Sequence, residues 1–465
     1  MTEKSPSVCI IGAGIGGLTA GALLTKKGFK VTIYEKEALL GGRALSIDDF
    51  SKITQKDYET LLARFHMRIA YAEPHLKEIF EKHLLDGYKL DLGYHAIGGG
   101  VFSNLNTVLK EFDTHLDFLE SYVGFITNTS WQYPFLSRLD KLKILPNILR
   151  LLFASETTMQ QLDTVSMTDT IKQYGKGKMK LILEIFSRSI TTVNNLSRIS
   201  TGEMFRAQKN LYRGSKPVGY PINGLNSIHT KLASYITDHG GIIHTNTPVT
   251  AINIENGKAK SITTNKNTKT YDIIISNIMV QNLFKIADPI HFDKSYVDAL
   301  TSLKGTASLC AYYSLKNINP ELIGKTFHFI ELDVGIDGND AVGMIDFMAT
   351  HPNAGLSPKN HYLIQSYIIC TPDEARNKKT VEKLKHLLDK NLEKTLPDYK
   401  KNLIWAIYPV IWHLDGVAKT LENTKPKIHT PIENLFLIGD CVKAPGIGMN
   451  CAINSARMLS QMLST

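Results

Sequence analysis

The sequence predicts an α/β protein with a parallel sheet and a second, α+β domain. Two segments lead to this fold class. Residues 8–35 read as a β-branched strand, a glycine-rich turn, a helix and a second strand. Residues 435–452, LFLIGDCVKAPGIGMNCA, read as a buried strand, a Gly-Asp turn and a glycine-rich helix start. A nucleotide-binding unit begins in this way, but only a short helix follows the second segment, so that segment is half of such a unit.

Composition limits the classes of protein that need to be considered. With 465 residues, 43% hydrophobic and 21% charged, the chain is expected to be globular, with two or three domains. Its five cysteines are scattered and form no CxxC pair, so neither a disulfide framework nor a structural metal site is expected, and a cytoplasmic location fits. The formal charge of +9 comes without a basic run or a nucleic-acid motif. A basic, soluble surface is the simplest interpretation, and contact with anionic lipid is the alternative.

The first glycine turn has the spacing of a dinucleotide-binding fingerprint, with Gly12, Gly14 and Gly17 between strand and helix. In this fingerprint the first glycine permits the tight turn, the second admits a pyrophosphate, and the third lets helix and strand pack closely. The helix N-terminus then offers amide donors to the phosphates. Glu35 ends the next strand, where an acid accepts hydrogen bonds from a ribose. A glycine-rich packing turn is the alternative interpretation.

A second glycine pair follows in YEKEALLGGRALS, where Gly41 and Gly42 precede Arg43. This arrangement resembles the flavin-containing amine oxidase and phytoene desaturase superfamily, whose GG-R element after the second strand helps to hold the diphosphate and the flavin. The guanidinium of Arg43 has the fork of donors that a diphosphate needs. The resemblance therefore implies that the nucleotide is FAD.

The segment KLDLGYHAIGGG carries the candidate catalytic residues, Tyr94 and His95. Plant-type phytoene and zeta-carotene desaturases have a similar Gly-x-His segment at the substrate face of the flavin. By that resemblance His95 could orient substrate or donate a proton. It could equally be a buried histidine that a backbone carbonyl satisfies, and Tyr94 is more typical of a core residue than of a catalyst.

Two later segments remain open to more than one interpretation. Leucines at positions 139, 142, 145, 149 and 152 alternate with basic residues, which fits a helix on a membrane surface or one that covers an ordinary core. In residues 403–416 the rings of Trp405, Tyr408 and Trp412 could line an apolar tunnel, form an amine cage or simply pack.

The same superfamily explains the C-terminal half-unit, because its FAD domain is assembled from separated pieces of chain and closed by an LFLxGD strand. Asp440 matches the carboxylate on the ribityl side of the flavin, and Val249 matches a valine whose backbone meets the adenine. The last helix begins with amides that face the isoalloxazine or the diphosphate. The implied cofactor-binding residues are Gly12, Gly14, Ile15, Gly16, Gly17, Glu35, Lys36, Gly41, Gly42, Arg43, Val249, Gly439, Asp440, Gly448, Met449 and Asn450.

The resemblance implies an α/β fold: a discontinuous, Rossmann-like FAD-binding domain of the GR2 type and a substrate domain with a mixed sheet and a helical part. The FAD-binding domain is expected in residues 1–97, 217–279 and 426–465. The substrate domain is expected in residues 98–216, mainly helical, and 280–425, with a mixed sheet and helices.

The predicted function is that of an FAD-dependent oxidoreductase, which moves a hydride between flavin N5 and a long apolar, isoprenoid or polyene substrate. Three alternatives stay open: an amine or amino-acid oxidase, a redox-neutral carotenoid-type isomerase, and a flavin-free module like the GDP-dissociation inhibitors of small GTPases. The expected partner is a small apolar molecule, with peripheral membrane contact as a further hypothesis. Nucleic acid and resident metal are not expected.

Overall fold

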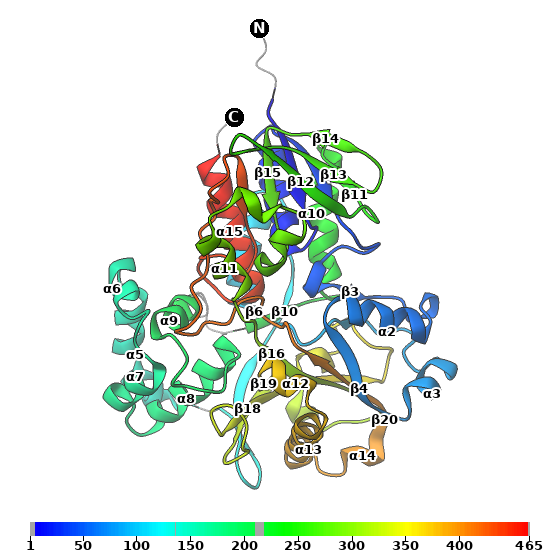
Figure 1. Cartoon of the computed structure of the whole chain (residues 1–465). Helices are drawn as coiled ribbons and strands as arrows, with labels where there is room; N and C mark the ends of the chain where they lie inside the picture. The colour runs from blue at the N-terminus through cyan, green and yellow to red at the C-terminus, as the bar shows by residue number, and fades with distance from the viewer. Residues whose placement is uncertain (1–4, 135, 210–217, 464–465) are drawn as a thin grey trace.

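The computed structural model describes residues 5–134, 136–209 and 218–463, and its two largest sheets lie one above the other in Figure 1. The upper sheet is parallel and includes strands from near both ends of the chain. The lower sheet is larger and mixed, and a lobe of short helices projects beside it (Figure 1).

The parallel sheet has five strands from three separate stretches of sequence, in the order β11-β2-β1-β15-β21. Every neighbouring pair is parallel. The strands are β1 (Ser7–Ile11), β2 (Lys30–Tyr34), β11 (Ile242–His244), β15 (Ile273–Ser276) and β21 (Leu435–Leu437). β1, β15 and β21 are almost entirely buried, and their runs of Val, Ile and Leu are typical of parallel strands that are covered on both faces.

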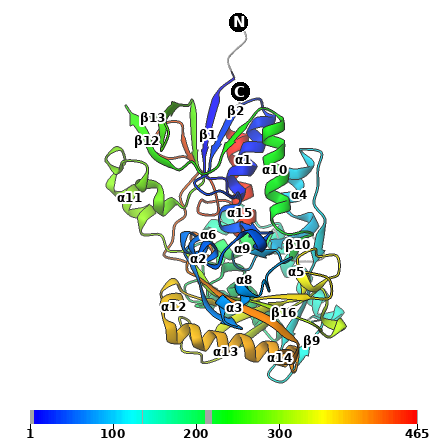
Figure 2. The same cartoon turned by 90° about the vertical axis from the view of Figure 1, so that its right-hand side faces the viewer.

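Three helices from distant parts of the chain pack side by side against this sheet (Figure 2). They are α1 (Ile15–Lys26), α10 (Asn226–Asp238) and α15 (Gly448–Met462). α1 lies between the other two and contacts both. Eleven of its twelve residues are buried, which explains why it is apolar on all sides. A small antiparallel sheet flanks this unit and consists of β12 (Val249–Glu255), β13 (Lys258–Thr264) and β14 (Thr268–Thr270).

The eight-stranded sheet has the order β4-β20-β16-β19-β18-β17-β8-β9 and is mixed, because β17 and β8 are parallel while the other pairs are antiparallel. Its strands are β4 (Met67–Glu73), β8 (Tyr122–Ile126), β9 (Trp131–Gln132), β16 (Ala307–Leu315), β17 (Lys325–Glu331), β18 (Ala341–Asp346), β19 (Tyr362–Cys370) and β20 (Leu403–Ile411). α13 (Lys378–Thr395) covers one face with Val381, Leu384 and Leu388. Side chains on the opposite face join the core cluster of the parallel sheet.

Short elements connect and surround the two sheets. The projecting lobe contains α5 (Arg138–Leu152), α6 (Glu156–Gln161), α7 (Met167–Tyr174), α8 (Lys178–Thr191) and α9 (Thr201–Lys209). The remaining helices are α2 (Gln55–Arg64), α3 (Leu76–Glu81), α4 (Asn104–Lys110), α11 (Lys294–Thr301), α12 (Pro372–Arg376) and α14 (Tyr399–Asn402). The short strands β3 (Ser46–Ile47) and β5 (Leu90–Asp91) pair with each other, and β10 (Val218–Pro221) lies between β6 (Ile97–Gly98) and β7 (Phe118–Glu120).

The predicted fold class is confirmed, with a discontinuous parallel sheet and a second unit that combines a mixed sheet with helices. The strand pairing also differs in detail from the predicted ranges. β4 lies within residues 1–97 but pairs with β20 in the eight-stranded sheet, and β8 and β9 lie within the range expected to be mainly helical. The pairings of β4 with β20 and of β8 with β17 join residues that are far apart in sequence and leave no local pattern. The domain boundaries themselves stay predictions. Over the described ranges, no helix combines the length and apolarity that crossing a membrane requires.

Candidate functional site

The glycine turn between β1 and α1 is held so closely that side chains would not fit. Gly12 has φ +99°, and its amide donates to the carbonyl of Tyr34 at 2.8 Å. A Cβ added to Gly17 would lie 2.1 Å from the carbonyl oxygen of Gly12. Gly14 is the N-cap of α1, no side chain caps this end, and the first turn carries no acidic residue. The helix therefore begins with backbone donors and its positive dipole end available to an anion.

Glu35 is fixed against this turn at the end of β2. Its carboxylate accepts hydrogen bonds from the amides of Ala13 at 2.8 Å and Glu37 at 2.9 Å, and the residue is 5% exposed. Burial raises the pKa of the Glu35 carboxyl, and the two amide donors oppose that rise. The neighbouring Lys36 is more exposed and pairs with Glu37 at 3.6 Å.

The second glycine pair lies directly on the first turn. The amide of Gly41 donates to the carbonyl of Ala13 at 2.9 Å, and Gly41 bridges to Gly14. A Cβ on Gly42 would lie 3.3 Å from the Cα of Gly14, and Gly41 and Gly42 have φ values of +118° and +59°. Two glycine-rich segments thus form one backbone surface without side chains, which fits a ligand that approaches the backbone closely.

Arg43 joins this surface to the far end of the chain. Its guanidinium forms an ion pair with Asp440 and donates to the carbonyl of Leu414 at 3.1 Å. Burial would raise the pKa of the Asp440 carboxyl, but the charge and hydrogen bond of Arg43 hold it well below its ordinary value. The second carboxylate oxygen of Asp440 accepts from the amide of Gly416 at 2.9 Å. Arg43, which is expected to hold the diphosphate, therefore contacts Asp440, which is expected to bind the ribityl side of the same cofactor.

The last helix begins beside the same surface. Like α1, α15 has no side-chain cap and no acidic residue in its first turn, which includes Gly448, Met449 and Asn450. The side-chain amide of Asn450 donates to the carbonyl of Gly98 at 2.9 Å, and its buried oxygen has no partner among the described residues. The amide of Gly439 donates to the hydroxyl of Ser455 at 2.9 Å, which fixes the Gly-Asp turn against α15.

Val249 begins β12 close to the end of β2. The amide of Thr247, two residues earlier, donates to the carbonyl of Glu35 at 2.8 Å. The rings of Tyr34 and His244 stack with centroids 5.1 Å apart on the same edge of the sheet. The segment predicted to meet an adenine thus lies beside the acid predicted to meet its ribose.

These residues fit a dinucleotide. The uncapped first turn of α1 lies close to α15, since a Cβ on Gly16 would lie 3.4 Å from Ala452 of that helix and 2.6 Å from Asn277. Glu35 accepts a hydrogen bond from Ala13 in the first glycine turn, and Asp440 pairs with Arg43, which follows the second. The arrangement provides amide donors for phosphates and carboxylate acceptors for hydroxyl groups.

The two candidate catalytic residues lie where the parallel sheet meets the eight-stranded sheet. The Nδ1 atom of His95 is 3.1 Å from the carbonyl oxygen of Gly93. Burial lowers the pKa of His95 to about 4, against the effect of backbone hydrogen bonds to Gly93 and Arg43, so its imidazole is neutral at neutral pH. The hydroxyl of Tyr94 donates to Asp346 at 2.9 Å, and its ring packs against Tyr367 with centroids 5.0 Å apart. These contacts favour positioning roles for both side chains.

A buried hydrogen-bond network stands behind His95. Asp91 is 2% exposed, accepts from the hydroxyl of Tyr220 at 2.6 Å, and lies 4.0 Å from His95. The hydroxyl of Tyr312 donates to the carbonyls of Asp91 and Gly93 at 2.8 and 2.6 Å. Burial raises the pKa of Asp91 to about 7. The network fixes the segment that carries His95 to β10 and β16.

Asp91 and Asn277 were not predicted from the sequence. The side-chain amide of Asn277 donates to the carbonyl of Gly12 at 3.1 Å and so braces the glycine turn from the end of β15. A polar residue directly after an apolar strand was the available signal for Asn277. A single acid within the apolar run KLDLGY was the signal for Asp91.

The aromatic residues of β20 do not form one wall. Trp405 belongs to the core beside the parallel sheet, whereas Tyr408 belongs to the core under α13 and donates to Asp389 at 2.7 Å. Trp412 stacks beneath Arg376, whose guanidinium carbon is 5.4 Å from the ring centroid. Of the three interpretations, these positions fit simple packing and not a tunnel shared by the three rings, because side chains at positions 405 and 408 point to opposite faces of a strand.

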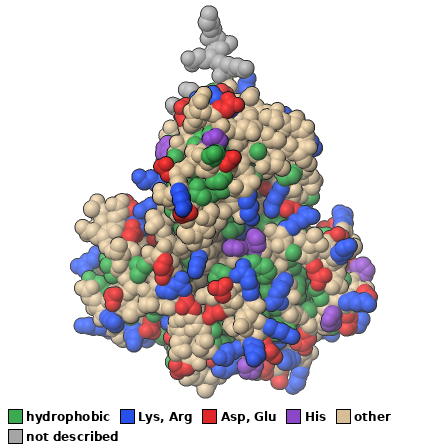
Figure 3. Space-filling view, viewed as in Figure 1, with side chains coloured by type: hydrophobic (Ala, Val, Ile, Leu, Met, Phe, Trp, Pro, Cys, Tyr) green, Lys and Arg blue, Asp and Glu red, His purple; other side chains and the backbone are tan. Residues whose placement is uncertain are grey.

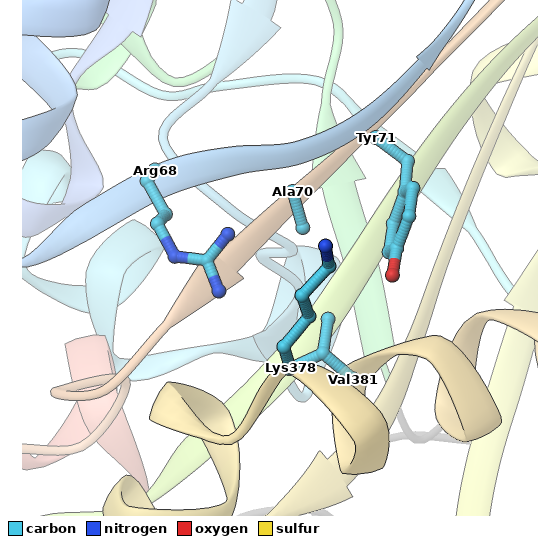
Figure 4. A pocket seen from close by; sticks show the side chains of 5 residues that line it. All are labelled: Arg68, Ala70, Tyr71, Lys378 and Val381. Atoms are coloured by element: carbon cyan, nitrogen blue, oxygen red, sulfur yellow. The ribbon is translucent and has the colours of Figure 1, made fainter.

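A pocket of about 250 Å³ lies elsewhere, between the edge strand β4 and α13 (Figure 4). It is lined by Arg68, Ala70, Tyr71, Lys378 and Val381. None of the predicted site residues contributes to it, and it lies on the α13 side of the sheet. It is therefore separate from the candidate site.

Comparison with known proteins agrees with this geometry. The family described as flavin containing amine oxidoreductase matches residues 15–463. A 4,4'-diapophytoene desaturase (4,4'-diapolycopene-forming) of Methylomonas sp is 27% identical over 273 residues, which are 55% of this chain and 50% of that protein. A phytoene desaturase of Fusarium fujikuroi is 44% identical over 70 residues, 15% of this chain and 12% of that protein. The chain thus spans half or less of the length of these curated relatives.

Solved structures share the fold over the whole chain. An oxidoreductase from Methanosarcina mazei has a TM-score of 0.71 at 20% identity, covering 98% of this chain and 100% of the other. Putrescine oxidase bound to putrescine has a TM-score of 0.67 at 13% identity, with 99% of both chains covered. A Rab GDI from Plasmodium falciparum has a TM-score of 0.54 at 15% identity, covering 97% of this chain and 96% of the other.

Proposed function

The chain belongs to the flavin-containing amine oxidoreductase family, and from this premise we propose that it moves a hydride between FAD and a long apolar substrate of the isoprenoid or polyene type. Membership makes the protein a flavin oxidoreductase with FAD as its cofactor. The substrate, the direction of the reaction and the roles of single residues belong to the proposal.

The proposed cofactor site is the backbone surface that both ends of the chain build. The glycine turn and the N-terminus of α1 would hold the diphosphate, with Glu35 on the ribose of the adenosine and Val249 beside the adenine. Arg43 and Asp440 would hold the diphosphate and the ribityl chain. The start of α15 would lie against the isoalloxazine, where its dipole stabilises negative charge.

One observation carries the proposed substrate class: the face of the eight-stranded sheet that meets the cofactor unit presents large apolar side chains. Its buried side chains include Met344, Tyr367 and Ile411, which join the same core cluster as residues of the parallel sheet. Large apolar side chains suit a hydrocarbon chain. The carboxylate of Asp346 lies on the same face, but it already accepts hydrogen bonds from Tyr94, Thr326 and the amide of Met348, which disfavours its use as the partner of a charged amine. The desaturase names of the curated relatives point in the same direction.

Bound FAD supplies the hydride acceptor or donor, and the residues of the chain align the substrate and exclude water. The neutral imidazole of His95, held by the backbone of Gly93, would orient the carbon that gains or loses the proton. Tyr94 and Asp346 would fix the neighbouring wall of the site. The buried network of Asp91, Tyr220 and Tyr312 would keep this segment rigid.

The proposal is tested by anaerobic flavin bleaching. The flavin-loaded protein is mixed with polyprenyl or carotenoid precursors, with other prenyl lipids and with a panel of amines. Loss of flavin absorbance near ~450 nm with the polyene precursors is the expected result, because only reduction of the cofactor removes this band. Bleaching by amines alone would replace the proposed substrate class with that of an amine oxidase. Conversion of an added polyene without net bleaching would instead indicate an isomerase.

The fold likeness to a Rab GDI keeps a binding module as the second candidate. That function needs no flavin, whereas the glycine surface with Glu35 and Asp440 has the groups that a dinucleotide requires. The purified protein is therefore expected to be yellow and to release FAD on denaturation. A colourless protein that takes up no FAD would favour the binding module.

A further inference from the structure

The helix α5 exposes an apolar face to solvent. Of the side chains that the structure describes on this helix, none is buried. Leu139, Leu142, Leu145 and Leu149 are 69%, 65%, 45% and 43% exposed, and Phe153, one residue beyond the helix, is 84% exposed. These five residues form the α5 leucine face. Amphipathic helices in globular proteins bury such a face, and a contiguous apolar patch on a surface indicates contact with a partner or a membrane.

Basic side chains border this face on both sides. At about 100° per residue, its five members fall within an arc of roughly 120°, with Lys143 and Arg150 at one edge and Lys141 at the other. The one acid of the helix, Asp140, is already neutralised, because Lys178 of α8 lies 2.8 Å from its carboxylate. Among the described residues, no carboxylate lies within ion-pair distance of the three bordering cations. Figure 3 shows hydrophobic and basic side chains exposed together on the lobe that α5–α9 form at the left.

We propose that the α5 leucine face docks on the surface of a membrane that contains anionic lipids. Leucine side chains would enter the boundary between headgroups and acyl chains, and the bordering Lys and Arg side chains would meet lipid phosphates. The helix has fifteen residues, too few to cross a bilayer, so it would lie in the plane of the interface. The positive border selects a lipid surface with negative charge over an uncharged apolar partner.

Membrane docking deepens the proposed function. It rests on that function only for the biological role of docking, which is to collect the substrate. A polyene or polyprenyl substrate is dissolved in the membrane, and a protein docked there would collect it without exposing it to water. The binding itself is independent of the reaction. It can therefore be measured on the flavin-loaded protein without any substrate.

The test is co-flotation with vesicles of phosphatidylcholine alone and of phosphatidylcholine with about 30% phosphatidylglycerol, at low and high salt. The unmodified protein is expected to float with the anionic vesicles and to dissociate as salt increases. Leu142→Ser with Leu149→Ser should weaken this binding about tenfold or more, since two apolar side chains no longer enter the interface. Lys141→Gln with Lys143→Gln and Arg150→Gln should weaken binding to the anionic vesicles and leave the weak binding to neutral vesicles unchanged.

Matched controls separate docking from folding. Ile290→Ser with Leu332→Ser removes two apolar side chains that are 81% and 66% exposed on other parts of the surface, and should leave flotation unchanged. All variants should retain flavin and their thermal midpoint, because no buried side chain is altered. Turnover of a detergent-dispersed substrate should also be unchanged in the leucine variant, so a failure of the proposed reaction is distinguishable from a failure of docking.

Two results would overturn the proposal. One is an unmodified, flavin-loaded protein that stays in solution with anionic vesicles at low salt. The other is self-association through this face: the unmodified protein would be a dimer, the leucine variant would be a monomer, and neither would bind vesicles.

Discussion

Arg43 and Asp440 come from opposite ends of the sequence and form an ion pair at the centre of the candidate cofactor site. Asp440→Ala should weaken FAD retention about tenfold or more, because the proposed charge-assisted hydrogen bonds to the ribityl chain would be lost and Arg43 would lose its partner. The measurement is flavin absorbance per protein after gel filtration. Glu433→Ala, which removes an exposed carboxylate paired with Lys258 at 2.7 Å, serves as the control. Equal flavin content in both variants would remove Asp440 from the cofactor site.

Asp91 is expected to make stability depend on pH. An unfolded aspartic acid ionises near pH 4, whereas burial raises the pKa of Asp91 to about 7 in the folded protein. Between these values the folded state binds more protons than the unfolded state, so stability decreases as pH increases from about 4 to about 7. As pH increases from 5 to 8, the raised pKa of Asp91 lowers the free energy of unfolding by about 2–3 kcal/mol.

Asp91→Asn should therefore be more stable relative to the unmodified protein at pH 8 than at pH 5, by roughly that amount. Denaturant unfolding at the two pH values measures this difference. Burial also raises the pKa values of Glu35 and Asp346, but their contributions are common to both proteins and cancel in the comparison. The exposed Asp298→Asn should show no such difference. A pH dependence that is identical in Asp91→Asn and the unmodified protein would contradict the raised pKa.

His95 is neutral above about pH 4, which limits what it can do in turnover. If His95 orients the substrate, His95→Ala should lower kcat about tenfold or more. In the unmodified protein, the dependence of kcat on pH should show no ionisation of His95 between pH 5 and pH 8. The exposed His386→Ala is the control. Unchanged turnover would make His95 a packing residue. A rate that increases tenfold for each unit of decreasing pH would instead assign the cationic form to catalysis.

Among the elements, the turn from β1 to α1 tolerates the least change. In Gly17→Ala the new methyl carbon would lie 2.1 Å from the carbonyl oxygen of Gly12, so α1 or β1 must move. The expected loss is roughly 2–4 kcal/mol of unfolding free energy, measured by denaturant titration. Gly28→Ala is the control, because a Cβ there would meet no atom within 4 Å. Its expected loss is about 1 kcal/mol, which comes from the positive φ of +86° alone. Equal losses in both variants would mean that the turn relaxes.

The elements that could be predicted from the sequence are those with a local signature. The glycine spacing at positions 12, 14 and 17 and the run before Asp440 located β1, α1 and β21, because each needs only neighbours in sequence to be visible. The pairing of β4 with β20 and of Asp91 with Tyr220 could not be located in this way. Such contacts depend on which surfaces meet after folding. The sequences of β4 and β20 contain no pattern that would predict their pairing.

On the scale of the whole molecule, one cofactor should couple the two ends of the chain. FAD binding is expected to slow amide hydrogen exchange both in residues 12–17 and in residues 439–450, since both segments would be ordered by the same ligand. At a free FAD concentration about 100 times its dissociation constant, the gain is about 2.7 kcal/mol of unfolding free energy. Exchange measured with and without FAD tests this, and protection confined to residues 12–17 would contradict a shared site.

The position of β21 at the edge of the parallel sheet has a consequence for biosynthesis. Four strands of that sheet are available once residue 276 has left the ribosome, but the fifth comes at Leu435–Leu437 and is followed by α15. A nascent chain therefore waits through more than 150 further residues with an open, apolar strand edge at β15. Chaperones would have to shield that edge during translation, and vitamin-derived flavin could be captured only after synthesis has passed the final helix.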